Sequence, residues 1–368
     1  MNKFITSIFL ITSTIIGLGV FVLPYTLANS GFYFWIWFLI VPFLIFIVHL
    51  AYSEIIFQIE EKHNLPGLAE KILGKKWKNL VWLIDFLGIL FVFASYYLAL
   101  SKFTNLIFSF NNSLIIQLLY AVLVIFIILF PINPFSKIES ALAFLMILIF
   151  LYLSFYFLPQ VNLSNFKIEF INPWLSYGVL IFAYTGYSSL QMVYDIIGKN
   201  KKTMLWVNLA SILLVTFLYL LFIISIYGTF GVNVSSTTLE NLKDISAKYI
   251  TVIVSLLAIL NILTTFIALA FYLKRGLIFD YNINPVLAWL FIGLSLITIP
   301  FLGLENIAKL VSLTGSIFLG FNLFILFLSY LKLKNYIYFK IPKFLVIILM
   351  ILLAFGWIVG ILSEYMGG

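Results

Sequence analysis

Two apolar segments of the sequence carry glycines near their middle, where a long helix would otherwise continue without interruption. Gly17 and Gly19 lie in the first apolar segment, and Gly186 lies in the sixth. Each glycine lowers helix propensity by about 1 kcal/mol. Unwound backbone presents N–H groups that bind an anion and carbonyl oxygens that bind a cation. Paired breaks could therefore hold a molecule with both charges, whereas a single glycine more often permits close helix packing.

Few ionisable side chains lie within the apolar segments. Glu54, Asp85 and Asp195 lie toward one end of their segments, and Lys309 lies near the end of another. Such residues are often functional, but for the three acids we favour a gate or an anchor near the lysines over a proton carrier. We expect no acid or base beside the glycines. A bound molecule should therefore have an uncharged side chain, because a buried unpaired charge is costly.

The cysteine and histidine counts exclude two kinds of chemistry. The chain has no cysteine, so it has no disulfide and no thiolate metal site. Its two histidines, His49 and His63, are too few for a histidine metal cluster. We expect no catalytic residues and no cofactor other than a coupling ion.

The composition places the chain in a lipid bilayer. Of its 368 residues, 64% are hydrophobic and 9% are charged, and the mean hydropathy is +1.17. Soluble domains average about 45–50% apolar and about 25% charged residues, which excludes a soluble enzyme, a secreted domain and a nucleic-acid-binding protein. We interpret the net charge of +8 as lysines that orient the helices, with no nucleic acid as a partner.

Apolar runs of about 20 residues, the length that crosses a bilayer as a helix, are separated by charged residues or by Pro, Gly and Asn. No run alternates apolar and polar residues as a membrane β-barrel requires. We predict an all-α integral membrane protein with a single domain. Its eleven transmembrane helices are expected at residues 4–29, 32–58, 78–101, 113–131, 138–158, 173–197, 203–230, 248–272, 283–301, 306–331 and 342–363.

The basic residues predict the orientation of this bundle. With the N-terminus in the cytoplasm, 16 of the 21 lysine and arginine residues lie on the cytoplasmic side and 5 lie outside. Cytoplasmic loops of membrane proteins carry such an excess, and one missed helix in mid-chain would scramble it. We expect a multi-pass protein of the cell membrane, with its N-terminus inside and its C-terminus outside.

The two sets of glycines lie five helices apart, in the first and sixth helices. Because five is an odd number, equivalent helices of the two halves run in opposite directions. Interrupted helices at matching positions of two inverted halves indicate the central site of a secondary transporter. A free amino acid carries both charges, so it suits paired breaks.

Four motifs resemble one transporter superfamily. The run from Thr14 to Pro24 is similar to the first-helix motif of the amino acid–polyamine–organocation superfamily, and Ala51–Glu54 resembles its motif at the end of the second helix. Leu65–Lys71 and Leu263–Phe266 are similar to its amino acid/auxin permease branch. The resemblance covers most of the chain and implies a LeuT-type 5+5 inverted-repeat fold. The repeats would cover about 4–158 and 173–331, and an extra helix would cover about 342–363.

The resemblance also implies which residues bind the substrate. Backbone amides of the first break would hold a carboxylate, and backbone carbonyls at both breaks would hold an amino group. A tyrosine of the third helix can reach the carboxylate in this fold, and packing in the core or against lipid is its alternative role. These substrate-binding residues are Ile15, Gly17, Leu18, Gly19, Val20, Tyr96, Phe182, Ala183, Thr185 and Gly186.

In sodium-coupled members of the superfamily, a cation lies between the first and eighth helices. The resemblance places its ligands here at the carbonyls of Ser13 and Ile16 and the hydroxyls of Thr264 and Thr265. Neutral oxygens of this kind suit a hard cation such as Na⁺. The alternative is that both threonine hydroxyls bond only to their own helix and that a proton is the coupling ion.

Together these features predict a secondary active transporter that imports a neutral amino acid, apolar or aromatic, by cation-coupled symport. Its partners would be the amino acid, Na⁺ or H⁺, and the lipid bilayer. Two alternatives stay open, which are a membrane-embedded lipid- or isoprenoid-modifying enzyme and a proton-coupled or exchange transporter of another small amine. We favour a transporter over an enzyme, because such enzymes need carboxylate or histidine clusters.

Overall fold

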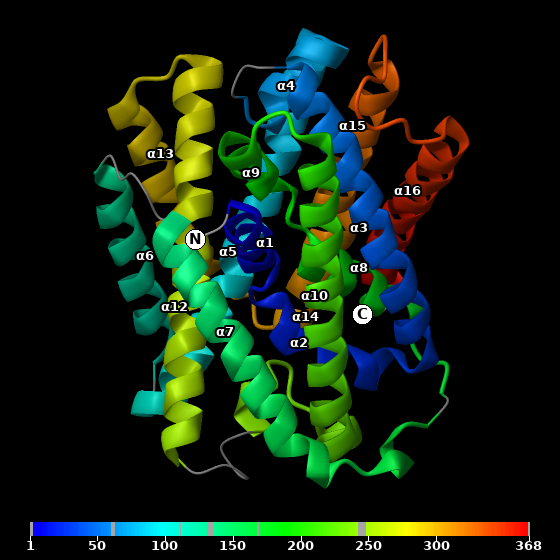
Figure 1. Cartoon of the computed structure of the whole chain (residues 1–368). Coiled ribbons are helices and arrows are strands. Elements are labelled where there is room, and N and C mark those ends of the chain that lie inside the picture. The colour runs from blue at the N-terminus through cyan, green and yellow to red at the C-terminus, as the bar shows by residue number, and fades with distance from the viewer. Residues whose placement is uncertain are drawn as a thin grey trace.

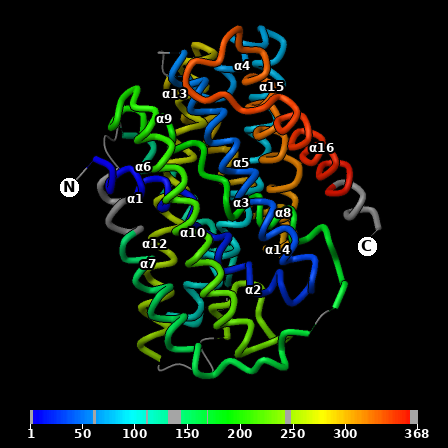
Figure 2. The backbone as a smooth tube through the Cα atoms, turned by 45° about the vertical axis from the view of Figure 1, so that its right-hand side comes forward, coloured from blue at the N-terminus to red at the C-terminus, as the bar shows by residue number. Residues whose placement is uncertain are grey.

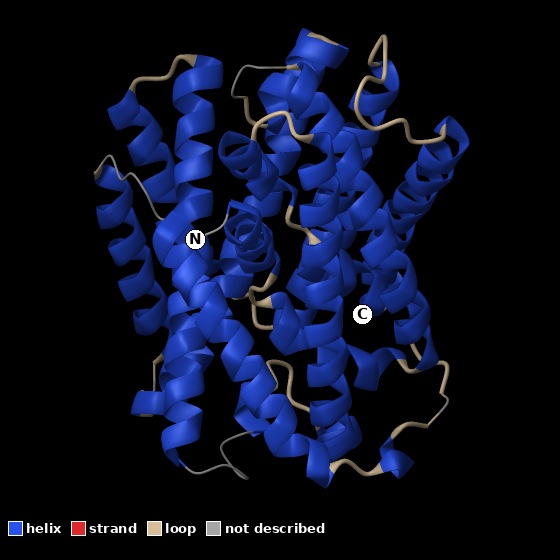
Figure 3. Ribbon diagram, in the orientation of Figure 1, coloured by secondary structure: helices blue, strands red, loops and turns tan. Residues whose placement is uncertain are grey.

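A bundle of helices makes up the part of the chain that the computed structural model describes, which is residues 3–59, 63–110, 112–130, 136–167, 169–241 and 248–366 (Figures 1 and 3). Within these residues, the one pairing of extended backbone is an isolated bridge between Gly31 and Phe170. The all-α prediction is therefore confirmed.

Seven of the described helices are long and apolar enough to cross a membrane. Two shorter apolar helices and two broken ones lie among them. Eleven crossings and the bounds of the two repeats therefore stay predictions. The main helices are α1 (Lys3–Ile15), α2 (Gly19–Ser30), α3 (Phe32–Gln58), α4 (Leu65–Leu73), α5 (Lys75–Phe108), α6 (Ser113–Leu129), α7 (Ser136–Phe157), α8 (Pro173–Tyr184), α9 (Leu190–Ile197), α10 (Lys201–Phe230), α12 (Lys248–Arg275), α13 (Pro285–Thr298), α14 (Ile307–Leu313), α15 (Gly320–Lys332) and α16 (Lys343–Met366).

The first and sixth apolar segments are both interrupted at the predicted glycines. Helix α1 ends at Ile15 and α2 begins at Gly19, with a bend of 53° between them. Helix α8 ends at Tyr184, and a short 3₁₀ turn, Tyr187–Ser189, precedes α9. The prediction of two broken helices is confirmed.

The two breaks pack directly on each other. A Cβ atom on Gly19 would lie 2.7 Å from the Cα atom of Ala183, and one on Gly186 would lie 2.5 Å from the Cγ1 atom of Ile15. Both contacts are closer than any side-chain carbon tolerates. At Gly19 and Gly186, the absence of a side chain therefore allows the close approach of the chains.

Helix α1 runs across the bundle, where it packs against α7 and α10 (Figure 2). On the other side of the breaks, α5 packs along α12. A π-helical segment, η7 (Thr314–Leu319), joins α14 to α15 and packs closely on α8. A Cβ atom on Gly178 of α8 would overlap the backbone of Ser312 in α14. A Cβ atom on Gly315 of η7 would overlap the backbone of Gly178. This close packing brings η7 and α15 beside the second break.

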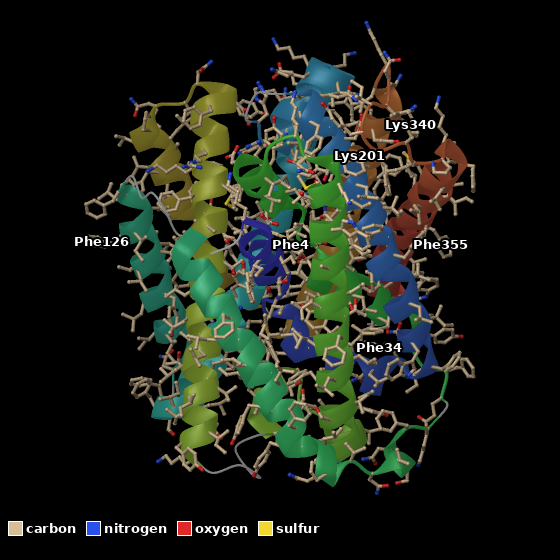
Figure 4. All side chains as sticks on the ribbon, in the orientation of Figure 1. Phe4, Phe34, Phe126, Lys201, Lys340 and Phe355 are labelled. Carbon is tan, nitrogen blue, oxygen red and sulfur yellow. The ribbon has the colours of Figure 1, made fainter. Side chains whose placement is uncertain are left out.

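The surface of the bundle fits a lipid environment. Phe126 of α6 and Phe355 of α16 lie on its sides, with 60% and 48% of their surface exposed (Figure 4). Lys201 and Lys340 both lie at the end of the bundle that carries α4, which we call the α4 end (Figures 1 and 4). The predicted orientation would make this end cytoplasmic.

Candidate functional site

A cavity of about 130 Å³ lies between the two breaks, α5, α12 and the η7–α15 segment. One water molecule needs roughly 10–15 Å³ of such space, so the cavity has room for a small organic molecule. Its walls are Thr14, Ile15, Gly17, Leu18 and Gly19 at the first break, Phe182, Thr185, Tyr187 and Ser188 at the second, and Asp85, Gly88, Ile89, Val92, Tyr96, Thr265, Leu269, Tyr272, Phe318, Leu319 and Asn322 around them.

Seven of the ten predicted substrate-binding residues line this cavity. They are Ile15, Gly17, Leu18, Gly19, Tyr96, Phe182 and Thr185. Gly17 leaves open space, since a Cβ atom there would meet nothing within 4 Å. The cavity therefore begins at the unwound backbone.

Val20, Ala183 and Gly186, the other three predicted residues, are not among those that line the cavity. Val20 and Ala183 are almost fully buried. The reason is the close packing of the breaks, because Ala183 contacts the backbone at Gly19 and Gly186 contacts Ile15. These three residues shape the site from behind.

Tyr219 of α10 joins the two broken helices, and no motif in the sequence marks it. Its buried hydroxyl lies 3.1 Å from the Ile15 carbonyl oxygen and 3.0 Å from the Ala183 carbonyl oxygen. A tyrosine hydroxyl has one hydrogen to donate, so the two carbonyls share it. Acceptor capacity therefore remains at the ends of α1 and α8.

Asp85 is the one acid among the residues that line the cavity. It lines the wall, where the Tyr272 hydroxyl donates to its Oδ2 atom at 2.6 Å and the Asn322 amide donates to its Oδ1 atom at 2.8 Å. The Asn322 amide also donates to the Tyr187 hydroxyl at 3.3 Å. The partners of Asp85 are therefore Tyr272 and Asn322, whereas the sequence analysis favours an anchor near the lysines. The cavity reaches Asp85 because it follows α5 away from the breaks.

Glu54 is an anchor, but its partner is also not a lysine. The buried carboxylate accepts hydrogen bonds from the backbone amides of Ile337, Tyr338 and Phe339 at 2.6–2.9 Å. It thereby ties the loop between α15 and α16 to α3. Glu54 does not line the cavity, and Asp195 is exposed on α9.

The four residues expected to bind sodium have other hydrogen bonds. The hydroxyls of Thr264 and Thr265 both donate to the Asn261 carbonyl, at 2.9 and 3.0 Å, and the Ser13 hydroxyl donates to the Leu10 carbonyl at 2.8 Å. The Asn261 side-chain amide donates to the Ile16 carbonyl at 3.0 Å. Asn261 thus links α12 to the first break directly. Within the described residues, no group of three or more histidine or acidic side chains could hold a metal ion.

Residues 231–241, which we call the lid, cover the end of the bundle opposite α4. The buried Thr238 hydroxyl donates to the Phe21 carbonyl of α2 at 2.6 Å. Lys102 of α5 forms an ion pair with Glu240 at 3.1 Å and a hydrogen bond with Ser236 at 3.1 Å. The lid therefore connects the broken helix to α5 on this side of the cavity.

Comparison with known proteins places the fold and the family. MhsT in complex with L-phenylalanine aligns with a TM-score of 0.73 at 14% identity, over 96% of this chain and 98% of that one. A mutant of the manganese transporter of Eremococcus coleocola aligns with a TM-score of 0.68 at 14% identity, over 98% and 87% of the two chains. These likenesses show a LeuT-type fold. No curated protein matches the sequence.

A comparison of the sequence with known protein families identifies the family. Residues 1–285 match the tryptophan/tyrosine permease family. The expected superfamily branch, the amino acid/auxin permeases, is not confirmed. With the fold and the apolar helices, the match makes the chain a multi-pass membrane transporter and not an enzyme. The chain belongs to the tryptophan/tyrosine permease family.

Proposed function

We propose that this permease is a secondary transporter that imports aromatic amino acids. The observation that carries the proposal is the position of the cavity, which meets the unwound backbone of both broken helices and is otherwise mostly apolar. Membership of the tryptophan/tyrosine permease family supports this substrate class. MhsT, which shares the fold, was solved in complex with L-phenylalanine.

The backbone of the breaks supplies both charges that an amino acid needs. Helix α2 begins at Gly19, and the amides of a first turn have no partner within the helix and favour an anion. We place the substrate carboxylate there. Helices α1 and α8 end at Ile15 and Tyr184, and the negative ends of their dipoles favour a cation. We place the ammonium group between them.

We propose that transport is coupled to a cation gradient, and Na⁺ is the first candidate ion. A hydroxyl that donates its hydrogen keeps lone pairs for a metal ion. The hydroxyls of Thr264 and Thr265, with the carbonyls of Ser13 and Ile16, therefore still offer oxygens to Na⁺. A cation there would hold the first break against α12.

A proton is the second candidate, and two contacts favour it. The Asn261 amide already makes the link between α12 and the Ile16 carbonyl that a cation would make. Asp85 lies in the cavity wall, and no described lysine or arginine forms an ion pair with it. A carboxylate without a cationic partner in an apolar site can carry a proton.

We further propose that the α4 end faces the cytoplasm and that the protein is in the cell membrane. The excess of basic residues in the loops predicted at that end supports the orientation. Substrate access would alternate as α1, α2, α3, α8, α9 and α10 rock against α5, α6, α12 and α13.

Uptake by purified protein in liposomes tests the proposal. Radiolabelled tryptophan should accumulate under an inward Na⁺ gradient at equal pH, or under an inward proton gradient without Na⁺, but not in empty liposomes. Thr264→Ala and Thr265→Ala should abolish only Na⁺-driven accumulation, and Asp85→Asn should abolish only proton-driven accumulation. Absence of saturable uptake of every aromatic amino acid, with folded protein and both gradients, would contradict the proposal.

A further inference from the structure

The cavity is polar at both ends and apolar between them. One end is the unwound backbone, and the other is the hydrogen-bonded group of Asp85, Tyr272 and Asn322. Asp85, Ile89, Val92 and Tyr96 follow one another at helical spacing on α5, so the two apolar residues lie between the ends. The proposed function uses only the backbone end.

The neighbouring helix α12 has contacts with both the first break and the far polar group. Its Asn261 contacts the Ile16 carbonyl at the first break, and its Tyr272 contacts Asp85 at the far end. These residues are eleven positions apart, which is about 16 Å at the rise of an α-helix. This separation leaves room between the two polar ends for an extended aromatic amino acid.

Tyr187 reaches the far polar group with its own side chain. It directly follows the second break, and its hydroxyl accepts a hydrogen bond from the Asn322 amide. One tyrosine side chain therefore spans the distance from the backbone of the break to the far polar group. A substrate with its amino and carboxyl groups at the breaks can reach that group with a side chain of similar length.

The far polar group has acceptors to spare. The Oδ1 and Oδ2 atoms of Asp85 accept from Asn322 and Tyr272 respectively, whereas a carboxylate has about four acceptor sites. The buried Oδ1 atom of Asn322 has no hydrogen-bond partner in the described part of the chain. The group therefore suits a hydrogen-bond donor, such as a phenol O–H or an indole N–H.

We propose that Asp85 and Asn322 determine specificity by accepting a hydrogen bond from the ring donor of the substrate. The inference rests on the proposed function and narrows its substrate class to aromatic amino acids whose ring carries an O–H or N–H donor. Tyrosine and tryptophan meet this condition and phenylalanine does not. A site built to bind a donor rejects the analogue that lacks it, because its buried acceptors then lose water without a replacement.

Matched substrate pairs test the inference in the wild-type protein at constant pH. Tyrosine is compared with phenylalanine, and tryptophan with β-(3-benzothienyl)alanine, in which sulfur replaces the indole N–H. Inhibition of labelled tryptophan uptake should be at least about tenfold stronger for the member of each pair that has the donor. Equal inhibition within both pairs overturns the inference, and because uptake itself is seen, the proposed function survives.

Variants of Asp85, tested with the same substrate pairs, separate recognition of the ring donor from ion coupling. Asp85→Leu should reduce the preference within each pair to about one, and Asp85→Asn, which keeps an acceptor, should retain part of it. Asp195→Asn, a matched change on the exposed face of α9, should leave the preference unchanged. If Asp85 serves only the coupling ion, both members of a pair lose uptake by the same factor, and this result also overturns the inference.

Discussion

Gly17 and Gly19 lie two residues apart at the first break and have opposite surroundings. A methyl group on Gly17 enters the cavity without touching protein, whereas one on Gly19 overlaps Ala183. We expect Gly17→Ala to fold normally and to lose most of its uptake, because the methyl group occupies substrate space. Gly19→Ala should instead lower the melting temperature. Uptake in liposomes and thermal unfolding in detergent measure the two effects.

Gly198→Ala does not serve as a control for these variants, because Gly198 has a positive φ of 65°. Gly293→Ala is suitable, since a Cβ atom there meets Ile125 at an ordinary contact distance of 3.5 Å. It should leave both uptake and melting temperature close to wild type. Full uptake by Gly17→Ala would show that the substrate does not lie against the first break.

Tyr219→Phe tests whether the Tyr219 hydroxyl, which bonds to the carbonyl oxygens of Ile15 and Ala183, positions the binding site for the substrate's ammonium group. Without it, the two carbonyls lose their common donor and their relative position is no longer fixed. We expect the KM for tryptophan to rise about tenfold, with little change in inhibition by indole-3-propionate, which lacks the amino group. Competition assays with the two compounds give this ratio.

Tyr184→Phe is the matched control for this variant. The ring of Tyr184 packs on that of Tyr219, and its hydroxyl donates to Thr216 of α10 at a distance of 3.2 Å, away from both carbonyls. It should leave the ratio of the two compounds unchanged. An equal loss for tryptophan and indole-3-propionate in Tyr219→Phe would indicate a general packing defect.

At the scale of residues, the sequence revealed the breaks but not the side chains that complete the site. Glycine lowers helix propensity whatever its neighbours are, so the breaks at Gly17, Gly19 and Gly186 could be predicted from the sequence. Tyr219 acts on backbone carbonyls, which any residue supplies, so no motif marks it. That Asp85 lines the cavity could not be predicted, because distance from the end of a segment does not tell which neighbours surround a side chain.

At the scale of elements, Glu54 fixes the loop before α16 to α3. Glu54→Gln replaces one acceptor oxygen by an NH₂ group, which opposes the backbone amides that donate to it. Hydrogen bonds to a charged group contribute roughly 1.5–3 kcal/mol each, so the unfolding free energy should fall by about that amount. Hydrogen exchange at Ile337–Phe339 should become faster. Transport should persist, because Glu54 lies outside the cavity wall.

Glu305→Gln is the control for that loop, since Glu305 is exposed. It should change neither stability nor exchange. Unchanged exchange at Ile337–Phe339 in Glu54→Gln would mean that the loop is held by other contacts, such as those of Tyr330 with Phe339 and Ile341.

The elements were more predictable than their ends. Apolar runs predict the type and order of the helices, because a segment in lipid must satisfy its own backbone. The third segment is expected at 78–101, but α5 extends over Lys75–Phe108. Polar residues such as Lys102 do not end a helix when they have partners, and here Glu240 and Ser236 of the lid supply them. Long-range contacts of this kind cannot be predicted from the local sequence.

At the scale of the whole molecule, the lid lies toward the end of the bundle opposite α4 (Figure 1). It joins two sets of helices that alternating access would move apart, because Thr238 bonds to α2 and Glu240 pairs with α5. The proposed transport cycle therefore requires the contact between the lid and α5 to open once per turnover. The contact itself is weak, since an exposed ion pair contributes about 0–1 kcal/mol.

A reducible crosslink across this contact should stop transport. The chain has no cysteine, so the pair Lys102→Cys and Glu240→Cys gives the only two thiols. Long side chains separate these backbones too far for a direct disulfide, and a short bifunctional methanethiosulfonate can span them. We expect the crosslinked protein to lose tryptophan uptake to the background of empty liposomes and to regain it after reduction. Each single-cysteine variant treated with the same reagent should keep its uptake. Undiminished uptake by fully crosslinked protein would mean that the lid and α5 move as one body, and the substrate path would then have to open elsewhere.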